Sequence, residues 1–323
     1  MRLQRVVAMI GAVGLTALGA GAATAQNFPA KSIFLFTAGA GGGADYAARL
    51  IAQGVSGILG QQVVVENRGG SPIIPAQAVV KAQPDGYTLL FYSNGIWILP
   101  LLQKNVPYDP QKDFVPITAA ASSPNVLVVH PSLPTRSVKD LIALARARPG
   151  ELNYAASPIG SAVHLAAELL NSTAGIKVAL IPYKDAAGAL SALISGEVQL
   201  MFPAAGSAMP LLKSGRIRAL AVTSRQPSAL LPGVPTMAAS GLPGFDVEVL
   251  YAILAPAGTP PAIVSTLNKA IVQAINQPGT KEKFSGAGLE AVGGSPEQLA
   301  SAIKTEMSTL GAVIRNAGIR LDY

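Results

Sequence analysis

Residues 33–59 read IFLFTAGAGGGADYAARLIAQGVSGIL, and this stretch decides the fold. Residues 33–37 form a short apolar run typical of a buried strand, and residues 44–59 have the alanine-rich pattern of a helix. A glycine-rich turn joins the two. Glycines there let backbone N–H groups approach a ligand closely, while the start of the helix contributes a partial positive charge. The stretch therefore predicts a βα unit with an anion-binding turn.

The same alternation continues along the chain in two sets of elements. The first set predicts a mostly parallel sheet made of βαβ units, and a second α/β set begins near residue 125. Strands are predicted at residues 62–66, 87–92, 125–130, 152–156, 177–182, 198–202 and 218–223, with helices at 44–59, 73–82, 161–174 and 186–195 and another opening at Ser137.

After Pro243 the pattern indicates a return to the first set. A strand at 245–254 and a helix at 260–276 are followed by Ser295-Pro296-Glu297-Gln298, a capping box that opens a last helix. The apolar residues of that helix recur at helical spacing, which indicates core packing. We therefore predict an α/β protein with two domains, residues 26–125 plus 251–323 and residues 126–250, joined by hinge strands near 125 and 245.

Composition limits the function further. The 323 residues include no Cys, which excludes disulfides and thiolate metal sites, and no spacing of residues indicates a metal site. Half of the residues are hydrophobic and 13% are charged, so the chain has enough apolar residues for two cores. The net charge is +7, but the basic residues are scattered and no nucleic-acid partner is expected.

The first 25 residues have the pattern of an export signal. Arg2 and Arg5 precede an apolar stretch at residues 6–23, and Ala23-Thr24-Ala25 supplies a small-residue cleavage site. We predict cleavage before Gln26 and a periplasmic protein that is not embedded in the membrane. A membrane anchor is the weaker alternative, because the apolar stretch is rich in glycine and short.

The glycine turn also admits other readings. Residues 39–44 fit the pattern G-x-G-x-x-A, and Glu66 ends the second strand where a dinucleotide-binding enzyme places its ribose-binding acid. Export from the cytoplasm and the carboxylate of Asp45 at the helix start count against that alternative, and a tight turn without a ligand remains a further one. His130 and His164 are the only histidines and no G-x-S-x-G motif is present, so we expect no enzyme.

Several blocks along the mature chain resemble those of the Bug family, the extracytoplasmic substrate-binding receptors of tripartite tricarboxylate transporters. The blocks occur in the family's order, which makes the resemblance more specific than any single motif. They include Pro29-Ala30-Lys31-Ser32-Ile33, the Gly-Gly-Gly-Ala-Asp turn, Val65-Glu66-Asn67-Arg68, Pro84-Asp85-Gly86-Tyr87, Tyr108-Asp109-Pro110, Gly233-Val234-Pro235-Thr236 and Leu254-Ala255-Pro256-Ala257-Gly258.

The resemblance implies a two-domain, periplasmic-binding-protein-like (Venus flytrap) fold with a central cleft. It also implies a monomer that binds a small carboxylate without a cofactor or metal and delivers it to membrane transporter subunits. A ligand-sensing partner of a two-component sensor is the alternative role. Carried over by position, the expected ligand-binding residues are Gly41, Gly42, Gly43, Asp45, Ser93, Asn94, Ser157, Ile159, Gly160, Ser161, His164 and Asp185.

Overall fold

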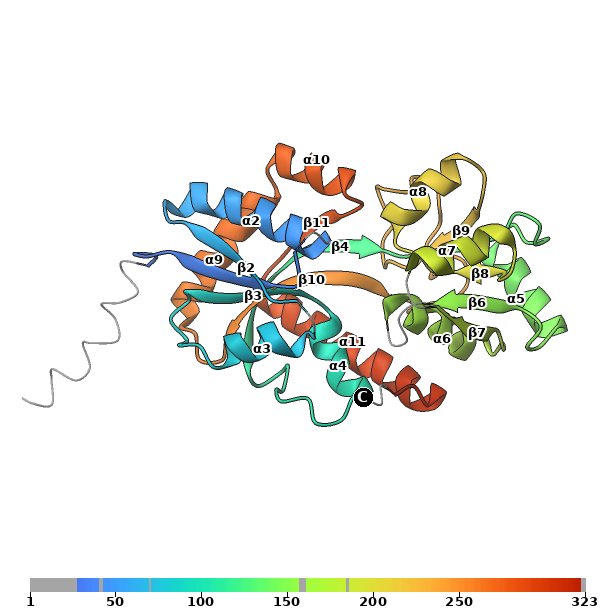
Figure 1. Cartoon of the computed structure of the whole chain (residues 1–323), viewed down its shortest axis with the longest axis horizontal. Helices are drawn as coiled ribbons and strands as arrows, with labels where there is room; N and C mark the ends of the chain where they lie inside the picture. Colours follow the sequence, from blue (N-terminus) through green and yellow to red (C-terminus); the bar gives the residue numbers. More distant parts are fainter. Residues whose placement is uncertain (1–27, 41–42, 70, 157–160, 184–185, 321–323) are drawn as a thin grey trace, which may run out of the picture.

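The computed structural model describes residues 28–40, 43–69, 71–156, 161–183 and 186–320. Within them the chain forms two α/β lobes connected by strands that cross from one to the other (Figure 1). The predicted export signal lies outside the described residues. So do six of the predicted ligand-binding residues, Gly41, Gly42, Ser157, Ile159, Gly160 and Asp185.

The first lobe is built on a sheet that has six strands in the described part of the chain, in the order β11-β4-β10-β3-β1-β2. Parallel pairing joins β1 to β2 and to β3, but β10 is antiparallel to β3 and β4, and β11 is antiparallel to β4. The strands are β1 (Ile33–Thr37), β2 (Val63–Asn67), β3 (Thr88–Ser93), β4 (Phe114–Pro124), β10 (Glu248–Pro256) and β11 (Glu290–Gly293).

The prediction of a mostly parallel first sheet is therefore wrong. The reason lies in the connection between the lobes: β4 carries the chain out of the first lobe and β10 brings it back. Two neighbouring strands with these opposite directions must pair antiparallel. Their register places Glu248 opposite Pro124, so both strands meet the second lobe at the same edge of the sheet.

Helices cover both faces of the first sheet. On one face, α2 and α9 pack against β1, β3 and β10, with α10 beside them. On the other face lie α3, α4 and α11. The helices are α2 (Gly43–Leu59), α3 (Ile73–Val80), α4 (Gly95–Leu102), α9 (Pro261–Ile275), α10 (Pro278–Gly286) and α11 (Pro296–Ala317).

The second lobe has a sheet of five strands within the described residues, ordered β7-β6-β8-β5-β9. Strand β6 is parallel to β7 and β8, whereas β5 is antiparallel to β8 and β9. The elements are β5 (Val126–Val129), α5 (Val138–Ala147), β6 (Asn153–Ala156), α6 (Ala162–Ala174), β7 (Ala179–Pro182), α7 (Ala186–Ser195), β8 (Leu200–Met201), α8 (Ala205–Lys213) and β9 (Arg218–Val222).

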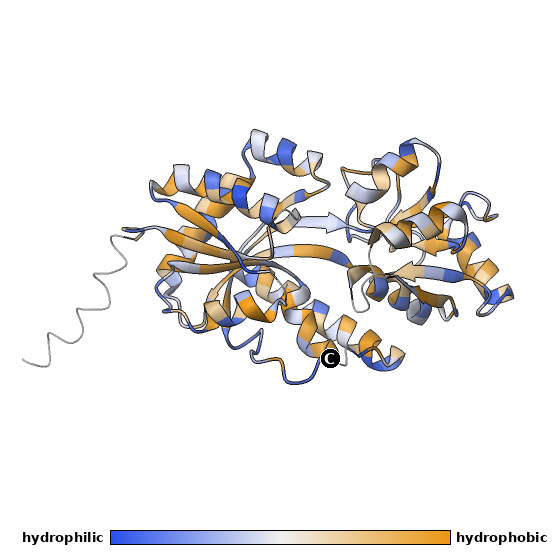
Figure 2. Cartoon of the chain, viewed as in Figure 1, coloured by the Kyte–Doolittle hydropathy of each residue, from blue (hydrophilic) through white to orange (hydrophobic). Residues whose placement is uncertain are grey.

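Side chains alternate across the second sheet as strand geometry requires. Val126 and Val128 belong to a core with α7 and α8, whereas Leu127 and Val129 belong to a core with α5 and α6. The core that contains Leu127 and Val129 also includes buried residues of α4 and α11 from the first lobe. One apolar cluster therefore joins the two lobes. Most strands of the first sheet are coloured hydrophobic, whereas β4 is pale where it crosses to the second lobe (Figure 2).

Candidate functional site

The two lobes present the carboxyl ends of their parallel strands to each other. Strand β3 ends where β10 begins, at the edge of the first sheet that meets the second lobe, and β1 runs parallel to β3. In the second sheet, Asn125 precedes β5 and forms a bridge with Ala204, which follows β8. Strands β6 and β7 are parallel to β8, so their carboxyl ends lie at the same edge of the sheet as Asn125. Ligands of open α/β sheets bind outside such carboxyl ends. The carboxyl ends of β1, β3, β6 and β7 therefore lie at the edges of the two sheets that face each other.

Asp45 is buried at the base of the first of these turns. Its carboxylate accepts a hydrogen bond of 2.8 Å from the Asn67 side chain and pairs with Arg49 Nε at 3.0 Å. Asn67, at the end of β2, also donates to the Ala38 carbonyl at 2.9 Å. The charge of Asp45 is thus compensated inside the lobe, so it does not oppose an anion at the glycine turn. Gly43 is the first residue of α2, where backbone N–H groups are unpaired within the helix.

Ser93 and Asn94 follow β3, but the Asn94 amide points into the protein. Its Nδ2 donates to the Glu248 carbonyl at 2.8 Å and to Glu306 Oε1 at 2.6 Å, while Trp97 Nε1 donates to Glu306 Oε2 at 2.8 Å. Two oxygen acceptors occupy the amide nitrogen, so the Asn94 side chain is left with an acceptor and no free donor. Asn94 therefore links β10 and α11, and Ser93, the last residue of β3, lies half-buried beside it.

Ser161 caps the start of α6, as predicted, and its side chain accepts a long hydrogen bond of 3.4 Å from the His164 backbone N–H. The His164 imidazole is buried and stacks on the Tyr154 ring at 6.3 Å between centroids. Burial lowers the pKa of His164, although the carboxylate of Glu168 opposes the shift. His164 is accordingly a neutral residue of the core at pH 7, packed beneath the start of the helix.

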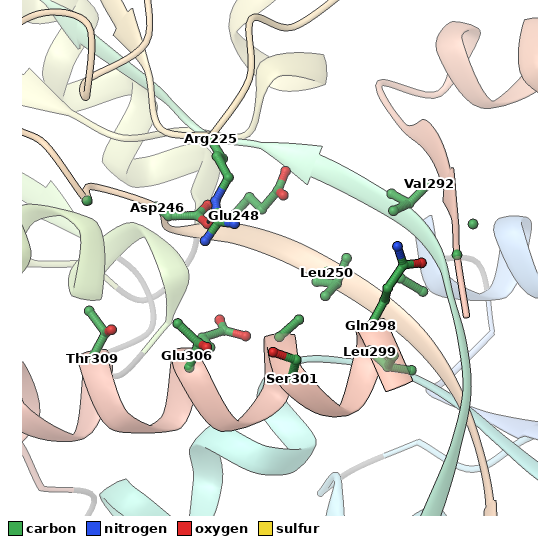
Figure 3. A pocket seen from close by; sticks show the side chains of 16 residues that line it. Arg225, Asp246, Glu248, Leu250, Val292, Gln298, Leu299, Ser301, Glu306 and Thr309 are labelled. Atoms are coloured by element: carbon green, nitrogen blue, oxygen red, sulfur yellow. Dashed lines mark ion pairs between the residues drawn. The ribbon is translucent and has the colours of Figure 1, made fainter. Parts of the chain in front are cut away.

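A cavity of about 640 Å³ lies at a different place, between α11, β10 and the segments around Arg225 and Gly244 (Figure 3). It also touches β11 and β4, which lie on the opposite side of β10 from β1 and β3. None of the predicted ligand-binding residues lines the described part of this cavity.

Acidic side chains dominate the cavity. Asp246, Glu248 and Glu306 face it, and the cation Arg225 already pairs with Asp246 at 3.3 Å. Burial raises the pKa of Glu248 and of Glu306 to about 7, and it raises the pKa of Asp246 against the effect of Arg225. Where these acids are ionised they disfavour an anionic ligand, and Arg225, the one cation in the described lining, is already paired with Asp246. The cavity is therefore a less favourable place for a carboxylate than the starts of α2 and α6.

Sequence reasoning missed the residues that hold the turns in place. Asn67 belongs to a motif that the sequence displays, but its partnership with Asp45 depends on the pairing of β1 with β2. Glu306 lies one position before Met307 on an otherwise ordinary amphipathic helix, and no local pattern separates it from a surface acid. Its two partners, Asn94 and Trp97, are more than 200 residues away in sequence.

The described residues contain no group of three or more acidic or histidine side chains arranged to hold a metal ion. In the same ranges, every helix is too short or too polar for a bilayer span.

Comparison with known proteins places the chain in one family. The sequence profile of the tripartite tricarboxylate transporter family receptors matches residues 47–319. BugT of Bordetella pertussis is 35% identical over 329 residues, which cover 99% of this chain and 100% of BugT. Two solved structures are similar. R. palustris Rpa4515 with adipate is 37% identical with a TM-score of 0.73, covering 91% of this chain and 99% of that one. MatC (Rpa3494) from Rhodopseudomonas palustris with bound malate is 29% identical with a TM-score of 0.69, and the match covers 89% of this chain and 100% of MatC. The chain belongs to the tripartite tricarboxylate transporter receptor family, which includes the Bug proteins.

Proposed function

We propose that this protein is a periplasmic receptor that captures a small carboxylate between its two lobes and delivers it to the membrane subunits of a tripartite tricarboxylate-type transporter. The observation that supports the proposal is that the carboxyl ends of β1 and β6, which precede α2 and α6, lie at the sheet edges where the two lobes meet. Related receptors of 37% and 29% identity have adipate and malate bound, which supports a carboxylate as the ligand class.

The physical basis is anion binding by backbone N–H groups. Helices α2 and α6 are 17 and 13 residues long, and the N–H groups of their first turns are the donors that we assign to the ligand carboxylate. The ligand-binding set is the one that the family resemblance implies. It comprises Gly41, Gly42, Gly43, Asp45, Ser93, Asn94, Ser157, Ile159, Gly160, Ser161, His164 and Asp185, and the contacts of Asp45, Asn94 and His164 favour a supporting role for these three.

The proposal includes the division of the chain and its location. Residues 26–125 with 251–323 and residues 126–250 are the two domains, and the chain passes between them near residues 125 and 245, which act as the hinge. Export with cleavage before Gln26 removes Arg2 and Arg5 and lowers the formal net charge from +7 to +5. A residual positive charge favours encounter with anionic ligands.

A thermal-shift screen of the chain from Gln26 onward tests the function. Adipate, malate, succinate and benzoate are compared with adipamide, which matches adipate in shape but lacks charge. At least one carboxylate should raise the melting temperature, and the increase should grow with ligand concentration, because the ligand binds the folded state and not the unfolded one. Adipamide should leave the melting temperature unchanged. If no carboxylate shifts the melting temperature at millimolar concentration, the proposed function is wrong.

A further inference from the structure

Asn125 is unusual among the buried polar residues of the described chain. Its side chain is 1% exposed, and neither its Nδ2 nor its Oδ1 has a hydrogen-bond partner. The only other buried side-chain atoms without a partner in these ranges are the hydroxyls of Thr37 and Thr135. Buried polar groups are almost always paired, and an amide that leaves both of its ends unpaired is more costly than a single hydroxyl.

The backbone does not explain why an asparagine is present. The Asn125 N–H donates to the Thr223 hydroxyl at 3.1 Å, and its carbonyl accepts from the Thr223 N–H at 2.9 Å. These bonds need no particular side chain at position 125. No turn or helix cap uses the amide either, because the residue lies in extended structure between β4 and β5. The side chain therefore has no structural task that a leucine of similar size would fail to perform.

The position of Asn125 relates it to the proposed carboxylate site. Asn125 bridges to Ala204, which follows β8, and β8 runs parallel to β6 with Met201 opposite Ala155. Helix α6, which Ser161 caps, is the element that follows β6 in the chain. Asn125 thus lies at the same edge of the second sheet as the α6 N-terminus, on the side that meets the first lobe.

The two described residues with an unpaired buried hydroxyl, Thr37 and Thr135, differ in their distance from the junction between the lobes. Thr37 is the last residue of β1 and leads into the glycine turn, so its unpaired hydroxyl lies at the corresponding edge of the first sheet. Thr135 lies beyond the other end of β5, in the connection to α5, away from the first lobe. The two unpaired residues nearest the junction between the lobes therefore belong to the two edges that face each other.

We propose that Asn125 is a ligand-anchoring residue: its Nδ2 donates to a carboxylate oxygen of the captured ligand, and its Oδ1 accepts from a hydroxyl beside that carboxylate. The inference rests on the proposed function and adds to it a residue and a preference. A simple carboxylate only accepts hydrogen bonds, so it pairs one end of the amide, whereas a hydroxycarboxylate pairs both. Malate and succinate differ by this one hydroxyl.

The test is calorimetric titration of the chain from Gln26 onward with malate and with succinate, for the wild type, Asn125→Leu and Thr135→Val. The wild type should prefer malate. Asn125→Leu should weaken malate binding about tenfold or more, abolish the preference, and raise the melting temperature of the ligand-free protein by about 2 to 4 °C, because an unpaired amide is removed. Thr135→Val removes the distant unpaired hydroxyl and should leave both affinities unchanged.

Each alternative outcome is decisive. A wild-type protein that binds succinate or adipate as tightly as malate, or an Asn125→Leu protein that binds malate with unchanged affinity, overturns the inference and leaves carboxylate capture intact. If the wild type binds none of the carboxylates in the screen, the proposed function fails instead. Asn125→Ala, checked by circular dichroism, replaces Asn125→Leu if the leucine prevents folding, and the same loss of malate affinity is expected.

Discussion

Glu248 is a partly buried acid on a strand that connects the two lobes. Burial raises its pKa to about 7, and the negative charges of Asp246, Glu290 and Glu306 add to the shift, while a hydrogen bond from Ser122 opposes it. Since the folded-state pKa lies above the ordinary value of 4.5, the protonated form is the one that folding favours. The contribution to stability is fully present below about pH 4.5 and is lost as the pH rises through 7.

Glu248→Gln should therefore change the pH dependence of stability. The glutamine carries no charge at any pH, so the variant should melt near the wild-type temperature at pH 5 and above it at pH 8. Because part of the Glu248 side chain is exposed, the gain at pH 8 should be on the order of 1 kcal/mol, less than the full pKa shift implies. Thermal melts at both pH values measure it, with the exposed Glu282→Gln as the control. A variant that is less stable than the wild type at pH 8 would contradict this electrostatic explanation.

A glycine pair fixes how closely two elements of different lobes approach. Gly288 lies between α10 and β11 with φ of +73°, and a Cβ atom placed on it would lie 2.6 Å from the Cα of Gly206 at the start of α8. No side chain fits at that distance. The contact therefore requires glycine at position 288, both for its backbone conformation and for the approach of α8.

Gly288→Ala should separate α8 from this turn. Gly150→Ala is the matched control, because Gly150 has φ of +78° and no neighbour within 4 Å of its Cβ position. Both variants should lose about 1 kcal/mol of stability from the backbone conformation. Gly288→Ala should lose more, and solution scattering of the ligand-free protein should show a larger radius of gyration for this variant alone. Equal melting temperatures and identical scattering profiles would mean that the two elements do not touch in solution.

The sequence predicts the elements better than it predicts their pairing. The strand at residues 33–37, the helix at 186–195 and the Ser295 capping box are confirmed, because each depends on local periodicity or capping. Strand β4 was not predicted. Its sequence FVPITAAASSP has few β-branched residues and two prolines, which is not typical of a central strand, although it pairs with β10 on one side and β11 on the other.

The candidate site likewise contains residues with local sequence signals and contacts that the sequence does not reveal. The glycine turn and Ser161 are recognisable because glycine and a capping serine carry local signals. Asn94 is predicted to line the ligand site, and the contact of its amide with Glu306 favours a supporting position there. That contact, like the unpaired amide of Asn125, depends on elements that are distant in sequence, and periodicity contains no information about them.

At the level of the whole molecule, the two sides of the connecting strands differ in character. The carboxyl ends of β1, β3, β6 and β7 lie on one side, with helix N-termini that favour anions. On the other side is the cavity of Asp246, Glu248 and Glu306, which disfavours them. Helix α11 packs against α4 of the first lobe and α6 of the second, so it contacts both lobes beneath the strands (Figure 1). This asymmetry predicts the side on which a carboxylate binds.

The most direct measurement is the crystal structure of the chain from Gln26 onward with adipate or malate, whichever gives the larger thermal shift. We expect ligand density between the lobes, with one carboxylate at the β1–α2 turn or the start of α6. For malate, we also expect the Asn125 amide about 3 Å from a ligand oxygen. Density in the cavity lined by Glu248 and Glu306, or on the outer surface of one lobe, would contradict capture between the two lobes.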